Sequence, residues 1–265
     1  METETVKTNQ PLSEVDLALC RATLYSALAL GFRPPTEETV ARLVSKEGAV
    51  TLADAAAILD PNQQSGLAAT CSLFTAHSSL FTPTASYRRL FGHTALGAVP
   101  PYETEYGSEA LFQQPQELGD LMGFYSAFGL TLNAAEHERP DHISCECEFL
   151  SFLALKEAYA LEHNDASMLE GTRGATRLFL RDHLGRFVPA FAKRLTREDR
   201  DGFYGALAEL CLRLVACECA RADLPLGPAG QDLRPATDDR VPMACGNGAE
   251  CAAMPGAGMP EEMEE

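Results

Sequence analysis

The chain of 265 residues lacks several short motifs that mark common enzyme classes. It contains no Gly-x-Gly-x-x-Gly fingerprint, no Walker A loop and no Gly-x-Ser-x-Gly elbow, so nothing in it indicates nucleotide binding or a serine hydrolase. It also lacks a Glu-x-x-His pair, which di-iron proteins use because both ligands must project inward one helical turn apart. These absences argue against catalysis by a familiar mechanism.

Signals for export and for β-structure are missing as well. Met1–Pro11 is polar and acidic, without the basic start and apolar core of a secretory signal. We find no apolar run close to the about 20 residues that span a bilayer, and expect no stable membrane insertion. No alternating strand pattern, Asn-Gly hairpin between β-branched runs or internal repeat is present. The sequence therefore predicts an all-α protein.

Positive charge is scarce. The 21 Lys and Arg residues face 38 Asp and Glu residues, a formal net charge of −17. This balance argues against nucleic acid or an anionic membrane as the main partner and favours cationic ligands or peptides, although acidity also serves solubility alone. The nine cysteines, in a chain without an export signal, indicate reduced thiols and a cytoplasmic location.

The apolar periodicity predicts a single-domain bundle of roughly ten helices. We expect a flexible N-terminus over 1–11, an all-helical domain over 12–226, and a flexible acidic tail containing Cys and Met over 227–265. The helices begin with caps such as Ser13 and Thr36. They are expected over 13–30, 36–44, 51–59, 63–81, 85–91, 115–128, 141–164, 166–184, 189–195 and from a cap at Thr196 to just before Pro225.

One stretch, 138–153, organises the rest. Pro140 interrupts a polar loop, and Asp141 is placed to cap a helix that is apolar on nearly every face and so belongs in the middle of the domain. His142 could be a first-turn surface residue. Glu146 falls inside the apolar sector, so its carboxylate must be satisfied by Arg or backbone amides, or line a groove.

A second stretch, 92–115, breaks the helical pattern. Its centre, Pro101–Tyr106, alternates aromatic and acidic residues, a combination that suits a basic peptide through ion pairs and cation–π contacts. The alternative is a loop that Tyr102 and Tyr106 hold against the core. A long connection without its own periodicity is often functional.

Three motifs together resemble the TorD/DmsD/NarJ-type maturation chaperones of molybdenum enzymes. They are Glu-Arg-Pro-Asp-His-Ile at 138–143 with its Glu-x-Glu-Phe-Leu helix, Tyr-Arg-Arg-Leu-Phe-Gly at 87–92 with Pro-Pro-Tyr-Glu-Thr-Glu-Tyr at 100–106, and Phe-Leu-Arg-Asp-His-Leu at 179–184 with Phe191 and Leu195. The resemblance covers about 12–222. Cys145, Cys147 and the tail lie outside the shared pattern.

The resemblance implies a cytoplasmic chaperone, not an enzyme, with no cofactor of its own. Its partner would be the apo catalytic subunit of a molybdopterin oxidoreductase, or that subunit's twin-arginine signal peptide, held until cofactor insertion and assembly before export. The chaperone would be a monomer or homodimer. A carboxylate-rimmed apolar groove would fit such a peptide. The candidate binding residues are Tyr102, Glu103, Glu105, Tyr106, Glu138, Pro140, Asp141, His142 and Glu146.

Two other interpretations stay open. The first is a helical metal-binding enzyme with an unrecognised site, although the Cys145/Cys147 and Cys217/Cys219 pairs are two apart on helices and cannot chelate one ion. We therefore predict no metal site. The second is an assembly subunit that stays in the mature oxidoreductase.

Overall fold

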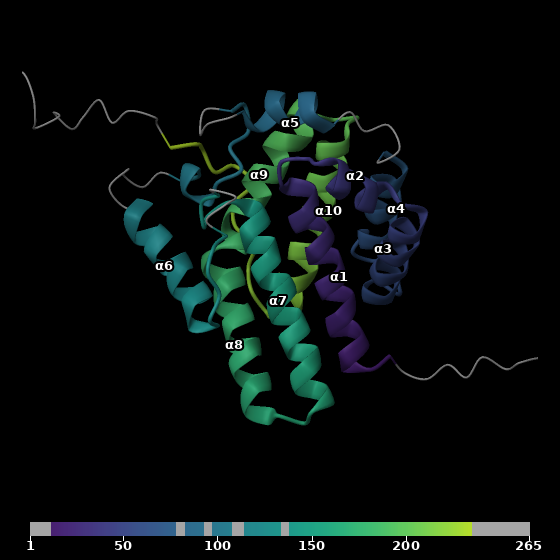
Figure 1. Ribbon diagram of the computed structural model, residues 1–265, viewed down its shortest axis with the longest axis vertical. Coiled ribbons are helices and arrows are strands. Elements are labelled where there is room, and N and C mark those ends of the chain that lie inside the picture. Colours follow the sequence, from purple (N-terminus) through teal and green to yellow (C-terminus); the bar gives the residue numbers. More distant parts are fainter. Residues whose placement is uncertain (1–11, 78–82, 93–96, 108–113, 134–137, 235–265) are drawn as a thin grey trace, which may run out of the picture. The chain divides into compact units, whose positions relative to one another are not determined.

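The computed structural model describes residues 12–77, 83–92, 97–107, 114–133 and 138–234. Within these ranges the chain forms α-helices joined by loops, with no β-strand, which confirms the predicted all-α class (Figure 1). The helices are α1 Glu14–Phe32, α2 Glu37–Val44, α3 Lys46–Leu59, α4 Leu67–His77, α5 Pro83–Phe91, the short 3-10 helix η2 Glu103–Glu105, α6 Gln114–Ala127, α7 Ile143–Glu162, α8 Ala166–Asp182, α9 Leu184–Glu198 and α10 Phe203–Arg221.

Helix α7 is central, as its sequence predicts. Figure 1 shows it between α1 and α8, and both helices pack along it. Its buried residues include Ile143, Phe149, Leu153 and Ala160, which lie on more than one face of the helix. A helix that is apolar nearly all round exposes a large hydrophobic surface to water unless other helices cover it on several sides.

Local signals fix the early helix starts. The Ser13 side chain accepts a hydrogen bond from the Asp16 N–H (3.1 Å), and the Asp16 carboxylate accepts one from the Ser13 N–H (3.3 Å), so the predicted capping box is confirmed. Thr36 caps α2 as predicted. Helix α3 starts at Lys46 rather than Thr51, because the Ser45 hydroxyl accepts from the Gly48 N–H (3.0 Å) and caps it earlier.

Helix α1 is long and apolar enough to cross a membrane, by length and composition only. This corrects the expectation that the chain has no apolar segment long enough to span a bilayer. More than half of its apolar window is buried inside the structure, and Leu24, Tyr25 and Leu28 lie in the core. A core helix of a folded protein passes the same test, so the finding is weak evidence for a membrane span.

Pro189 was predicted to begin a helix, but it lies inside α9. A proline within a helix has no N–H for the carbonyl four residues earlier. Here that carbonyl, of Gly185, accepts a hydrogen bond from the Gly227 N–H (3.0 Å), far along the chain. Gly227 must approach closely to do so: a Cβ there would overlap the carbonyl oxygen of Arg186.

The predicted cap at Thr196 is wrong, because α9 continues to Glu198. The start of α10 is instead organised by Asp199, whose Oδ2 accepts from the N–H groups of Tyr204 (3.0 Å) and Gly205 (3.3 Å). A carboxylate near a helix N-terminus satisfies free amide donors wherever the chain brings it, not only at the capping position.

The packed part of the chain extends beyond the predicted boundary at residue 226. The Gly107 N–H donates to the Asp232 carbonyl (2.9 Å), and the Arg234 N–H donates to the Glu105 carbonyl (2.8 Å). The Arg234 guanidinium, buried, pairs with Glu117 (2.8 Å). Residues 227–234 therefore belong to the packed unit rather than to a free tail. The predicted flexible segments at 1–11 and 235–265 lie outside the described residues.

Candidate functional site

The two loop motifs that the sequence singled out lie against each other. The Glu103 N–H donates to the Asp141 carbonyl (2.9 Å), and the Ile143 N–H donates to the Pro101 carbonyl (2.9 Å). Tyr102 and His142 form an isolated antiparallel bridge. We call the unit formed by 101–106 and 138–146 the loop junction. It fixes η2 on the first turn of α7.

Asp141 ties the loop junction together rather than capping α7. Its carboxylate accepts from the Thr104 N–H (3.2 Å) and hydroxyl (2.7 Å), and from Arg139 Nε (2.9 Å) and Nη2 (2.8 Å). The N-cap is His142, whose Nδ1 accepts from the Ser144 N–H (3.1 Å). The prediction of an Asp141 cap is wrong because a guanidinium and a hydroxyl from the two loops compete for the carboxylate.

His142 is fully buried, which overturns the surface alternative. Its ring packs edge-on against Tyr102, with centroids 5.3 Å apart. Burial, with Arg33 and Arg139 nearby, lowers the pKa of His142 to about 3, so the imidazole is neutral near pH 7. The Arg139 guanidinium lies 4.4 Å from the Tyr102 ring centroid and 3.5 Å from the Glu105 carboxylate.

The aromatic–acid loop is partly a packed structure, as its alternative interpretation proposed. Tyr106 is buried and donates its hydroxyl proton to the Pro100 carbonyl (2.9 Å). Glu103 is also buried, and its carboxylate contacts His183 Nδ1 (3.1 Å) and Arg186 (2.8 Å). Neither side chain reaches solvent, so a partner cannot touch them in this conformation.

Glu146 is the exception among the buried acids. It is fully buried, and neither carboxyl oxygen has a hydrogen-bond partner among the described residues. Burial raises the pKa of Glu146 well above its ordinary value, and the carboxylates of Glu103 and Asp141 raise it further. The surroundings of Glu146 therefore favour the protonated, neutral form of its carboxyl. The predicted satisfaction by Arg or backbone amides is not found.

The accessible part of the loop junction consists of Tyr102, Glu105, Glu138, Arg139, Pro140 and Cys145, all partly exposed. Glu138 lines two pockets. One, of about 290 Å³, is formed with Pro34, Pro35, Tyr87, Pro101 and Tyr102 among others. The other, of about 400 Å³, is formed with Arg33, Leu132, Cys145, Glu148, Phe149 and Phe152 among others.

Glu138 thus stands between two partly apolar hollows. Burial raises the pKa of its carboxyl.

Sequence reasoning missed the contributions of Arg139, Thr104 and Tyr87. Arg139 and Thr104 stand inside the quoted motifs, so their neighbours could have pointed to them. Tyr87 also stands inside a quoted motif, but it reaches Glu138 only through the tertiary fold.

A second buried charge cluster lies further along α7. Glu157 contacts Arg21 of α1 (2.6 Å) and Arg173 of α8 (2.8 Å), and Arg21 also contacts Glu218 of α10 (3.5 Å). Burial acts to raise the pKa of Glu157, but Arg21 and Arg173 lower it below its ordinary value. This cluster joins four helices and was not anticipated.

Over the described residues the protein is helical, with two pockets beside the loop junction. Among the described residues, no group of three or more His, Cys, Asp and Glu side chains could hold a metal ion. The family model described as "Nitrate reductase delta subunit" matches residues 51–193, more than half of the chain. The chain belongs to this family, which includes the TorD- and NarJ-type proteins.

Curated relatives carry related names. The chain is 42% identical over 78 residues to the chlorate reductase assembly chaperone protein of Ideonella dechloratans, covering 29% of this chain and 39% of the relative. It is 30% identical over 133 residues to the chaperone protein TorD of Vibrio cholerae (49% and 58%). It is 27% identical over 212 residues to the perchlorate reductase assembly chaperone protein of Dechloromonas aromatica (77% and 90%). The first two matches span less than two thirds of those relatives.

Proposed function

We propose that this protein is an assembly chaperone that binds the apo catalytic subunit of a molybdopterin oxidoreductase in the cytoplasm. Membership of the family and the names of its relatives support this role. In the proposal, the chaperone retains the subunit until its cofactor is inserted, and then releases it for assembly and export. The chaperone itself needs no cofactor, and works as a monomer or homodimer.

The proposed binding surface is the exposed part of the loop junction with its two pockets. The observation that carries it is the position of Glu138, a carboxylate between two hollows lined largely by Pro, Tyr, Leu and Phe. A twin-arginine signal peptide presents guanidinium groups followed by an apolar stretch, which matches a carboxylate beside apolar walls. Tyr102 adds an aromatic edge to the same surface.

The buried candidates have a different role in this proposal. Glu103, Tyr106, Asp141 and His142 hold the loop junction in shape. Of the predicted residues, Tyr102, Glu105, Glu138 and Pro140 can touch the client, beside the partly exposed Arg139 and Cys145. Glu146, also buried, has no contact role in this conformation.

The test is a titration of a synthetic twin-arginine signal peptide against the wild type, Glu138→Gln and a control, Glu170→Gln. Glu170 is an exposed acid on α8 outside all of the pockets described above. We expect Glu138→Gln to weaken binding about tenfold, because a charge-assisted hydrogen bond is lost, and Glu170→Gln to bind as the wild type does. Equal affinity for all three proteins would place the signal peptide elsewhere.

The family description, which names a subunit, favours a second candidate: a component that remains in the mature oxidoreductase. Purification of the finished oxidoreductase separates the two. A transient chaperone is absent from the active complex, whereas a retained subunit is present in stoichiometric amount.

A further inference from the structure

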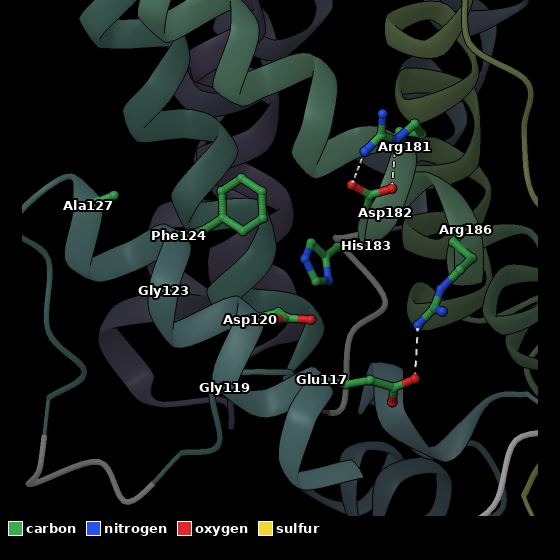
Figure 2. A pocket seen from close by; sticks show the side chains of 10 residues that line it. All are labelled: Glu117, Gly119, Asp120, Gly123, Phe124, Ala127, Arg181, Asp182, His183 and Arg186. Carbon is green, nitrogen blue, oxygen red and sulfur yellow. Dashed lines mark hydrogen bonds and ion pairs between the residues drawn. The ribbon is translucent and has the colours of Figure 1, made fainter. Parts of the chain in front are cut away.

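The pocket between α6 and the junction of α8 with α9 is separate from the surface around Glu138. It has a volume of about 640 Å³, and its lining includes Asp120, Phe124, Asp182, His183 and Arg186 (Figure 2). Figure 2 shows the His183 ring between Phe124 and Asp120, with α6 on one side and the start of α9 on the other.

Contacts to Glu103 and Phe124 orient the His183 ring, and they involve only one of its two nitrogens, Nδ1. The residue is 5% exposed, its Nδ1 lies 3.1 Å from the buried carboxylate of Glu103, and its ring stands edge-on to Phe124 with centroids 5.3 Å apart. The Nε2 atom has no hydrogen-bond partner among the described residues. The Glu103 carboxylate beside Nδ1 favours the tautomer with its proton on Nδ1, in which Nε2 carries a lone pair and can accept a hydrogen bond inside the pocket.

The charges around the pocket balance except for one. Arg186 is within reach of Glu103 (2.8 Å) and Glu117 (3.6 Å), Arg234 pairs with Glu117 (2.8 Å), and Arg181 pairs with Asp182 (2.6 Å). Asp120 is exposed and has no ion pair or hydrogen bond to any described residue. Helix α6 carries no basic residue that could compensate it.

Several of the α6 residues that line the pocket have a small side chain or none. Gly119, Gly123 and Ala127, spaced four apart, line the pocket, and a Cβ placed on either glycine would meet no atom within 4 Å. A ligand can therefore lie close to the helix backbone while it reaches Asp120 and His183.

We propose that this pocket binds a guanidinium group, as carried by an arginine on a partner segment. A guanidinium has five N–H donors in a planar fork, so it can donate to the Asp120 carboxylate and to His183 Nε2 at once, while Phe124 offers an aromatic contact. A neutral isostere of arginine lacks the charge that Asp120 recognises. Because the probe is a small molecule, this site is tested independently of the proposed chaperone function.

The probes are Nα-acetyl-arginine amide and its neutral counterpart Nα-acetyl-citrulline amide. Binding is followed by the NMR chemical shift of the His183 imidazole, assigned by its absence in His183→Gln. We expect a saturable shift with the arginine probe and at least fivefold weaker binding of the citrulline probe. Asp120→Asn should weaken binding of the arginine probe at least fivefold, and Gly123→Leu, which fills the pocket, should abolish it.

Two matched controls complete the test. Gly171→Leu places the same side chain on α8 at another exposed glycine with open space around it, and Asp54→Asn removes an exposed acid from α3. Both should bind the arginine probe as the wild type does, and all variants should melt near the wild-type temperature. Equal binding of the two probes, unchanged affinity in Asp120→Asn and Gly123→Leu, or a shift produced by sulfate in place of the arginine probe would overturn the proposal.

Discussion

Helix α7 buries two glutamates in opposite circumstances. Glu146, in its first turn, is fully buried without a hydrogen-bond partner among the described residues, and burial raises the pKa of its carboxyl. Glu157, three turns later and 3% exposed, contacts Arg21 and Arg173, which lower the pKa of its carboxyl despite burial. On the same helix, the surroundings of one glutamate favour its protonated form and those of the other favour its anion.

The difference shows what a buried carboxylate needs. Moving an ionised carboxylate out of water costs on the order of several kcal/mol, and only close cations with good geometry offset this cost. Glu157 has two such cations from neighbouring helices. Near Glu146, Arg186 acts to lower the pKa but is engaged by Glu103, whereas the carboxylates of Glu103 and Asp141 raise the pKa. Protonation of Glu146 then costs less free energy than burial of its unpaired charge.

The largest expected effect is at Glu157. Glu157→Ala leaves the buried guanidinium of Arg21 with only the longer contact to Glu218. We expect a loss of about 3 kcal/mol in the free energy of unfolding, because an uncompensated buried charge remains. Urea denaturation of the wild type, Glu157→Ala and the exposed control Glu170→Ala measures it. A loss below about 1 kcal/mol would mean that the cluster contributes little net stability.

The pH dependence of stability should differ in sign between the two sites. Because the folded pKa of Glu146 is raised above the unfolded value near 4.5, the folded state holds the extra proton above that pH, and its contribution to the free energy of unfolding falls as pH rises. The slope is at most about 1.4 kcal/mol per pH unit. For Glu157, whose folded pKa is lowered, stability is present above pH 4.5 and is lost as pH falls through the folded pKa.

The measurement is a set of denaturation curves from acid to mildly alkaline pH for the wild type, Glu146→Gln and Glu157→Gln. The contribution of His142 is common to all three and cancels in the differences. The wild type should lose stability relative to Glu146→Gln as pH rises above about 5. If the difference is flat with pH, Glu146 does not carry a raised pKa.

We expect the smallest change in the free energy of unfolding when the unpaired acid, Glu146, is removed. Glu146→Leu replaces a partnerless buried carboxyl by an apolar side chain of similar length, so we expect a gain in the free energy of unfolding of about 1 kcal/mol at pH 7. The matched change, Glu157→Leu, should be destabilising. A clear loss in Glu146→Leu would reveal a partner for Glu146 that the structure does not show.

Much of the fold followed from local patterns. Ser13 and Thr36 were recognisable as caps because a hydroxyl and an acceptor three residues on act within one helical turn. The central place of α7 followed from its apolar circumference. Asp141 was misassigned because its carboxylate is engaged by Arg139, two residues away, and by Thr104, which is distant in sequence. Thr196 was misassigned because α9 continues past it.

Part of the site was also foreseen. The motifs at 100–106 and 138–143 were expected to act together, and the structure joins them through hydrogen bonds between their backbones. The burial of Glu103 and His142 was not foreseen, since their polarity argues for the surface and only the tertiary contacts supply His183, Arg186 and Tyr102 around them.

The sequence by itself determined that Glu146 lies on the apolar side of a central helix, because residue spacing fixes direction on a helix. Only the tertiary structure decided that it stays unpaired while Glu157 does not. Arg21 faces Glu157 because α1 packs along α7, and Arg186 turns to Glu103 because η2 lies on the start of α9. Charge pairing is a property of contacts between helices, which no single helix specifies.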